Sequence, residues 1–492
     1  MTHLPVLQVV VPLLAAPLCA LVKSGRLAWI LAVSSSWCAF LIACKIFHEV
    51  QQSGVISYNL GGWSAPVGIE YRIDALGAFV LIIVTLVGAV VTPYALMSVE
   101  EEIDESKRAL FYAAFLLCLS GLLGIIVTGD VFNVFVFLEI SSLSAYALIA
   151  LGKDRRALTA AYQYLIMGSV GATFIVIGIG LLYVMTGSLN MADLAVLLPD
   201  LPSNRTVPVA FAFLTVGVCL KLALFPLHMW LPNAYAYAPS AVTSFIASTA
   251  TKVAIYILLR FFFTVFGANY SFLEMQIGTY LLPLSLVAIF SMSLVAVFQT
   301  NIKRMLAYSS LAQIGYIILG ISFFSNAGLT AGILHLFNHA VIKGSLFMAL
   351  GCVMYRLKSV EIDDMRGLGK RMPLTMGAFV IGGFSLIGVP FTAGFISKWY
   401  LIQAALEQGL WPVAVLILTA SLMAVVYIWK VVEAVYFSDG SGLQNSEYSE
   451  APMGLLLPTW ILAFLCLYFG IDATLTTLGA SSAAAHLMGI GS

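Results

Sequence analysis

Long apolar segments separated by short polar connections run along the whole chain. A helix that crosses a lipid bilayer needs about 20 mostly apolar residues. A scan for such segments predicts fourteen spans. They cover residues 4–22, 27–47, 75–98, 109–128, 131–151, 157–185, 207–230, 240–263, 277–299, 304–324, 329–355, 374–406, 411–436 and 453–475. The polar stretches are too short for a soluble domain, so residues 1–492 are expected to form one all-α, polytopic membrane domain.

The amino-acid composition supports a membrane protein and argues against several classes of function. Of the 492 residues, 61% are hydrophobic and 9% are charged, whereas soluble domains carry roughly 25% charged residues. The net charge is zero, which gives no reason to expect a nucleic-acid partner. The seven cysteines are scattered without CxxC or Cys/His spacing, so we expect no iron–sulfur site, no zinc site and no cofactor.

Lysine and arginine alternate between the two sides of the predicted bundle. Cytoplasmic loops are enriched in these residues. With the N-terminus outside, 15 of the 23 basic residues fall in predicted cytoplasmic loops, while Lys45, Arg72, Arg205 and Arg260 fall in outer loops. We therefore expect a multi-pass protein of the bacterial cytoplasmic (inner) membrane, with both termini on the periplasmic side.

The remaining four basic residues, Lys221, Lys252, Lys343 and Lys398, fall inside predicted spans. A charge at the centre of a bilayer costs at least about 2.5–3.5 kcal/mol, and such residues are functional by default. All four are lysines. The pKa of a lysine responds strongly to its surroundings, whereas an arginine stays protonated. This choice of residue suits a path for protons.

Two of these lysines accompany predicted helix breaks. Lys221 precedes Pro226 in the seventh span, and Lys398 follows Pro390 in the twelfth. Proline removes a backbone hydrogen bond and breaks a helix, and a break within the membrane is tolerated only inside protein or beside a water-filled cavity. Paired interrupted spans point to a transport site. The alternative is that these are ordinary prolines of membrane helices.

Glu139 and Lys252 are further candidates. Glu139 lies in the fifth span and is followed by Ser141, Ser142 and Ser144, which can hydrogen-bond a carboxylate or a water. We interpret it as a proton carrier paired with a buried lysine; the alternative is a packing carboxylate. Lys252 has serine and threonine neighbours, which favours a proton relay over a structural ion pair.

His335, His339 and Lys343 repeat at every fourth residue, so they line one face of the eleventh span. Histidine titrates near neutral pH and can pass a proton, which favours a relay. A zinc site is the weaker alternative because no HExxH motif and no neighbouring carboxylate occurs. A polar stripe that only joins helices is a third interpretation.

Three motifs carry a resemblance to a known family. They are FxxxEIxSLxxYxL around Glu139, KxxxxPxHxWLPxAYxxAP from Lys221 to Pro239, and NIKRxLAYSSxAQxGY from Asn301 to Tyr316. Over essentially its full length the chain resembles the antiporter-like subunits of complex I (NADH:quinone oxidoreductase) and of Mrp multisubunit cation/proton antiporters. Lys303 and Arg304 in the last motif look like a cytoplasmic cap outside the path.

The resemblance implies two inverted five-helix repeats, at 109–263 and 277–436, with broken helices seven and twelve. It also implies one role for each candidate. Glu139 matches the helix-five glutamate and Lys221 its partner; Lys252 matches the connecting lysine of helix eight; His335, His339 and Lys343 match the relay of helix eleven; and Lys398 matches the terminal ionisable residue of helix twelve.

Within this family the chain resembles most the D-type Mrp subunit, because no long lateral helix follows the last span and position 398 is a lysine. The implied function is proton translocation in a multisubunit Na⁺ (monovalent cation)/H⁺ antiporter, together with other membrane subunits in the bilayer and without redox chemistry of its own. The alternative is a proton-pumping subunit of a complex I-type oxidoreductase or a membrane-bound hydrogenase. A quinone-binding or metal-binding redox subunit, a passive scaffold and a solitary channel are the rival classes.

Overall fold

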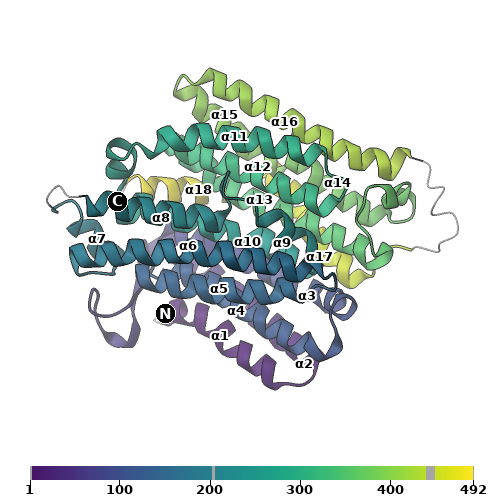
Figure 1. The fold of residues 1–492 in the computed structure, drawn as a ribbon, viewed down its shortest axis with the longest axis horizontal. Helices are drawn as coiled ribbons and strands as arrows, with labels where there is room; N and C mark the ends of the chain where they lie inside the picture. The colour runs from purple at the N-terminus through teal and green to yellow at the C-terminus, as the bar shows by residue number, and fades with distance from the viewer. Residues whose placement is uncertain (1–2, 202–204, 439–448, 491–492) are drawn as a thin grey trace.

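The computed structural model describes residues 3–201, 205–438 and 449–490, and long helices running side by side dominate it (Figure 1). Helix α13 lies in the middle, α1 and α2 lie at one edge, and α16 lies at the other. The helices are α1 (Leu4–Leu21), α2 (Gly25–Ser53), α3 (Ala75–Glu102), α4 (Arg108–Val127), α5 (Val131–Ala150), α6 (Arg156–Thr186), α7 (Met191–Leu197), α8 (Thr206–Leu222), α9 (Leu231–Tyr237), α10 (Ser240–Leu259), α11 (Ile277–Val297), α12 (Ile302–Ser322), α13 (Asn326–Leu357), α14 (Pro373–Ile387), α15 (Ala393–Glu407), α16 (Trp411–Val432), α17 (Met453–Ile471) and α18 (Thr474–Leu487).

The structure confirms the polytopic all-α prediction. In the described ranges, twelve helical segments are long and apolar enough to cross a membrane. The other two predicted spans are the broken ones: the seventh, at 207–230, contains α8 and the break after it, with α9 following directly, and the twelfth consists of α14 and α15. Short 3-10 helices and π-helices complete the helical elements: η1 (Leu60–Gly62), η2 (Glu105–Lys107), η3 (Arg260–Val265), η4 (Tyr270–Glu274), η5 (Asp363–Met365), η6 (Leu368–Lys370) and η7 (Glu433–Phe437).

Three elements were not predicted. Strands β1 (Ile56–Asn59) and β2 (Glu70–Ile73) form an antiparallel hairpin between α2 and α3, with Ile56 opposite Ile73. The short helix α7 follows α6, and the C-terminal helix α18 packs against α3 and α13. All three are too short or too polar to register in a search for segments of bilayer length.

Burial places α13 at the centre of the bundle. The most apolar 18-residue window is 100% buried in α13 and 94% buried in the segments containing α10 and α12, but only 33% buried in α1, α2 and α16. The helices at the edges expose leucine, isoleucine and tryptophan side chains, which is the surface that hydrocarbon solvates. Polar side chains on α10, α12 and α13 are therefore shielded by protein on all sides.

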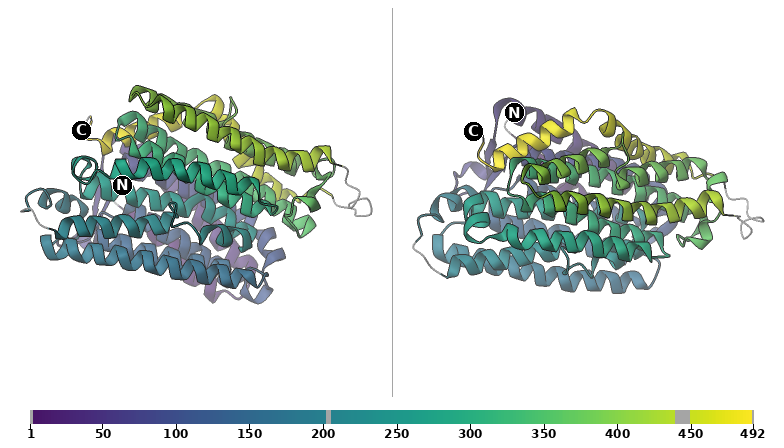
Figure 2. Two further views of the ribbon diagram at one scale, coloured as in Figure 1. Left: turned by 45° about the horizontal axis from the view of Figure 1, so that its top comes forward. Right: turned by 90° about the horizontal axis from the view of Figure 1, so that it is seen from above.

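The two ends of the bundle differ in charge. The connections that precede α2, α4, α6, α12 and α14 carry most of the loop lysines and arginines and lie at one end, which we call the basic end. Both termini lie toward the opposite end (Figures 1 and 2). The structure thus keeps the charge asymmetry that predicts a cytoplasmic basic end.

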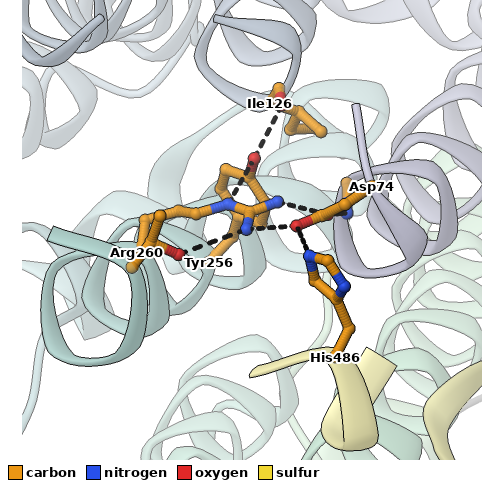
Figure 3. A network of polar contacts seen from close by, with 7 residues as sticks. Asp74, Ile126, Tyr256, Arg260 and His486 are labelled. Carbon is orange, nitrogen blue, oxygen red and sulfur yellow. Dashed lines mark hydrogen bonds and ion pairs between the residues drawn. The ribbon is translucent and has the colours of Figure 1, made fainter. Parts of the chain in front are cut away.

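A buried ion pair joins four segments at the opposite end (Figure 3). Arg260 donates hydrogen bonds of 2.6 and 2.5 Å to the two carboxylate oxygens of Asp74. Its Nε donates to the hydroxyl of Tyr256, which in turn donates to the carbonyl of Ile126. His486 of α18 lies 3.1 Å from Asp74. The prediction that Arg260 lies in an outer loop was wrong: α10 continues into η3, and this helical turn buries the guanidinium.

Asp74 is held in its ionised form. Burial by itself favours the neutral acid, but Arg260, His486 and the amide of Gly77 outweigh it, so the pKa of Asp74 lies well below its usual range. Asp74 also accepts a hydrogen bond from the Gly77 amide as the N-cap of α3. The carboxylate therefore anchors the start of α3 to the end of α10.

We expect Asp74→Asn to destabilise the protein by about 3–5 kcal/mol, because Arg260 would remain buried without a countercharge. Thermal unfolding of the purified protein measures this loss. The matched control is Asp104→Asn, since Asp104 and Lys107 form a 3.1 Å pair whose side chains are 64% and 53% exposed; an exposed pair contributes about 0–1 kcal/mol. Because a lowered pKa stabilises the fold above the unfolded value, the loss should persist above about pH 4 and shrink below it. Equal losses in both variants would contradict this role.

Candidate functional site

Glu139 and Lys221 form an ion pair between α5 and α8. The ammonium of Lys221 lies 3.1 Å from Glu139 Oε1 and donates a second hydrogen bond of 3.0 Å to Ser142 Oγ. The Lys221 side chain is 5% exposed, whereas that of Glu139 is 26% exposed. Of the serines after Glu139, Ser142 contacts the lysine and not the carboxylate. Ser141 and Ser144 donate to backbone carbonyls.

The break in the seventh span lies directly beside Lys221. Helix α8 ends at Leu222, and Ala223 adopts a left-handed conformation with φ of 59°. The indole of Trp230 donates to the carbonyl of Leu220, one of the carbonyls that the break leaves without a helical partner. The end of a helix carries partial negative charge, so the break also stabilises the Lys221 ammonium.

A small cavity of about 30 Å³ lies between Lys221 and α10. Its polar lining includes Lys221, Ser141, Ser142 and Tyr164, and Ala250 and Ala254 of α10 close the other side. A polar cavity needs roughly 10–15 Å³ to hold a water molecule. The space next to the ion pair is therefore large enough for water, and Lys252 is not among the residues that line it.

Lys252 is completely buried on α10 and has no carboxylate partner among the described ion pairs. Its ammonium donates 2.6 Å to the carbonyl of Ala247 and contacts the hydroxyl of Thr251 at 3.5 Å. The alternative of a structural ion pair at Lys252 thus finds no support in the described part of the chain.

His335, His339 and Lys343 line one face of α13, as their spacing predicts, and each is at most 2% exposed. The two imidazole rings lie parallel, 6.1 Å apart. His335 hydrogen-bonds to Ser397 Oγ at 2.8 Å and to Gln313 Oε1 at 2.9 Å. In contrast, neither ring nitrogen of His339 has a partner in the described structure. Water is the natural partner for such a buried ring.

Lys343 closes the row on α13. Its ammonium donates to the carbonyl of Leu306 at 2.8 Å and to the hydroxyl of Ser309, both on α12. Lys252 lies close enough to Lys343, His339 and His335 to repel a positive charge on each, and Lys398 does the same to His335. The structure therefore brings these five side chains into one cluster.

Lys398 lies after the break between α14 and α15, and its side chain extends back to the residues at this break. Helix α14 ends at Ile387, Gly388 adopts φ of 90°, and α15 begins at Ala393. The Lys398 ammonium donates to the carbonyls of Leu386 and Ile387, at 3.1 and 2.8 Å, and lies 5.1 Å from the ring centre of Tyr316. Both broken spans thus place a lysine at the carbonyl end of their first half-helix.

The candidates form two groups rather than one continuous chain of contacts. Glu139 and Lys221 form the first, and the five residues from Lys252 to Lys398 form the second; the small cavity borders only the first, through Lys221. Sequence reasoning missed Gln313 and Ser397, which hold His335. Their signal was weak, because a single glutamine or serine in a span is also common in helix packing.

The fold and the buried charges define a multi-pass membrane protein with ionisable side chains in its interior. A family model described as "NADH:quinone oxidoreductase/Mrp antiporter, TM" matches residues 128–424, a range that includes every candidate. The chain belongs to this family, and the resemblance inferred from its motifs is confirmed.

Relatives from two kinds of complex are similar to this chain. NADH-quinone oxidoreductase subunit N of Desulforudis audaxviator (strain MP104C) is 42% identical over 88% of this chain and 86% of that protein. The D-type subunit of the Na(+)/H(+) antiporter of Bacillus subtilis (strain 168) is 29% identical over 96% and 94%. A chain in the structure of the Mrp complex from Dietzia sp. DQ12-45-1b matches with a TM-score of 0.90 and 26% identity, over 99% of this chain and 98% of that one.

A double-mutant cycle tests the Glu139–Lys221 pair. Glu139→Gln should lower thermal stability because it leaves the buried Lys221 ammonium without a countercharge, and adding Lys221→Met should recover part of the loss. The measurement is the thermal midpoint of the two single variants and the double variant. Ser144→Ala is the matched control, since its hydroxyl bonds only to its own helix. Strictly additive effects would show that the pair does not interact.

Proposed function

We propose that this chain is the proton-translocating subunit of a multisubunit antiporter that exchanges Na⁺ or another monovalent cation for protons. The observation that carries the proposal is the Glu139–Lys221 ion pair, which lies next to a second, fully buried group of lysines and histidines. Four buried lysines on separate helices are costly to a membrane protein. Proton transfer gives a reason for their presence that packing does not.

The ion pair acts as the switch. While Glu139 is ionised and close to Lys221, its negative charge holds the proton on the lysine. Two unit charges 4 Å apart attract by about 4 kcal/mol at an effective dielectric constant of about 20, which is about a thousandfold in a proton-transfer equilibrium. Separation of the pair therefore suffices to send the proton of Lys221 toward Lys252.

The remaining side chains carry the proton onward. From Lys252 it passes to the group formed by His335, His339 and Lys343, and it leaves through Lys398. The small cavity beside Lys221 gives room for a water molecule at the start of this path. Ser397 joins His335 to the helix that carries Lys398.

Two inverted repeats at 109–263 and 277–436 provide the frame for this path. Their support is that each broken span carries one buried lysine near its break: Lys221 lies in the last turn of α8, and the Lys398 ammonium contacts the last carbonyls of α14. In a bacterial inner membrane, the basic end faces the cytoplasm and both termini face the periplasm, as the distribution of lysine and arginine predicts.

The host complex has one alternative with specific support. The 42% identity to subunit N of an NADH-quinone oxidoreductase favours a place in a redox-driven complex. Resemblance to the D-type antiporter subunits over 96% of the chain favours the antiporter. In both cases the chain contributes proton transfer and binds its neighbouring subunits within the bilayer; it carries no redox chemistry itself.

Replacement of Lys221 by alanine tests the proposed function. We expect cation-driven proton transport by the assembled complex in vesicles to fall by about 100-fold or more, as for other positioned proton-transfer groups. Subunit assembly should stay intact, because the carboxylate that loses its partner, Glu139, is 26% exposed and can be solvated. Near-normal transport by this variant would refute the proposal.

A matched pair of glycine substitutions tests the position of Lys398. Gly388 and Gly409 both have positive φ, of 90° and 71°, so alanine costs roughly 1–2 kcal/mol of backbone strain at either site. A Cβ at Gly388 would lie 3.0 Å from Lys398 Cδ, whereas one at Gly409 meets nothing within 4 Å. Both variants should lose similar stability, and only Gly388→Ala should also lose proton transport. Equal transport would contradict the role of Lys398.

A further inference from the structure

A cavity of about 430 Å³ opens at the basic end of the bundle. It lies where the ends of α3, α9, α12 and α13 meet, and Glu101, Glu102, Lys303 and Lys358 are among its lining residues. It therefore borders both proposed repeats, since α9 belongs to the first and α12 to the second. The proposed function assigns no role to this cavity.

Lys303 is buried in the wall of this cavity. The residue is 2% exposed, and its ammonium donates 3.3 Å hydrogen bonds to the carbonyl of Ala238 and to Ser240 Oγ. No carboxylate among the described residues lies within ion-pair distance of it. Lys303 was expected to be a cytoplasmic cap; it does lie at the basic end, but α9 and the start of α10 cover it.

Ser240 connects Lys303 to a second ionisable group, Glu102. The backbone amide and the hydroxyl of Ser240 donate to Glu102 Oε2, at 2.9 and 3.2 Å. Ser98 donates to the other oxygen of Glu102 at 2.7 Å. A carboxylate and an ammonium at the cavity wall thus share one serine hydroxyl, which can accept a proton from one side and give one to the other.

A stripe of hydroxyls leads inward from Ser240. On α10, Ser240, Ser244, Ser248 and Lys252 recur every fourth residue, so they lie along one side of the helix over about 18 Å. The hydroxyl of Ser248 is completely buried and has no partner in the described structure. A Cβ built on Gly344, the neighbour of Lys343, would lie 3.2 Å from this hydroxyl. The stripe therefore runs between the helices that carry Lys252 and Lys343.

We propose that this cavity is the mouth through which protons enter or leave the relay at the basic end, with Glu102 and Lys303 as its proton-exchanging groups. The inference rests on the proposed function. A hydronium ion in the cavity gives its proton to the Glu102 carboxylate and becomes water. The Ser240 hydroxyl takes that proton and gives its own to neutral Lys303, which then hands one on to the α10 stripe. Each further hydroxyl, or a water beside it, accepts one proton and releases one, until Lys252 takes the last in its neutral form.

Matched substitutions at one cavity test the mouth. Glu102→Gln keeps the size and the hydrogen-bonding capacity of the side chain but cannot take up a proton. Lys303→Arg keeps the positive charge but does not release its proton. Both should reduce cation-driven proton flux of the complete complex in liposomes by about 100-fold or more. The controls are Glu101→Gln and Lys358→Met, which alter a solvent-exposed ion pair on the same cavity and should keep the wild-type rate.

The possible results of these experiments distinguish the proposal of the cavity mouth from the proposed proton relay. Full transport by Lys303→Arg and Glu102→Gln, in a preparation where Lys221→Ala is inactive, would overturn the mouth and leave the proposed function standing. Activity of Lys221→Ala would overturn both. If Glu102→Gln raised the half-saturating Na⁺ concentration without lowering the maximal proton flux, the cavity would bind the cation instead, and the proposal would fail.

Discussion

The cost of burying an ammonium group away from water governs this structure. Each buried lysine needs acceptors, and the helices supply them in three ways. Lys221 contacts a carboxylate, Lys398 contacts the last carbonyls of a half-helix, and Lys252 takes a carbonyl of its own helix. A straight, uninterrupted helix leaves few carbonyls free within the bilayer. The break between α14 and α15 is therefore the structural condition for burying Lys398.

The contrast between Asp74–Arg260 and Glu139–Lys221 follows from the residues involved. Arg260 forms two short hydrogen bonds to a buried carboxylate and stays protonated, so this pair holds the helices together. Lys221 has one bond to a carboxylate that is 26% exposed. A single contact to a partly exposed partner can break and form again. A transport cycle requires such a contact, whereas an ion pair that holds helices together must stay formed.

Sequence patterns predicted the spans and the candidate charges because polar groups are costly in hydrocarbon. Membrane helices are therefore long and apolar, and a charged residue within one stands out. The partnership of Glu139 and Lys221 could also be anticipated, since a buried lysine needs a counter-ion. The burial of Lys303 and Arg260 could not: both lie at helix ends, where a side chain faces water or protein according to how neighbouring elements pack. Helix α18 and the β-hairpin were not predicted for a related reason: their stability comes from tertiary contacts.

Helix α13 is continuous over 32 residues and is the most enclosed segment of the protein. Its two imidazoles and one ammonium are therefore held on one unbroken backbone. The helices that carry Lys221 and Lys398 are interrupted, and at a break the backbone dihedral angles can change without the loss of consecutive helical hydrogen bonds. A movement of these two lysines relative to α13 would therefore leave the backbone of α13 intact.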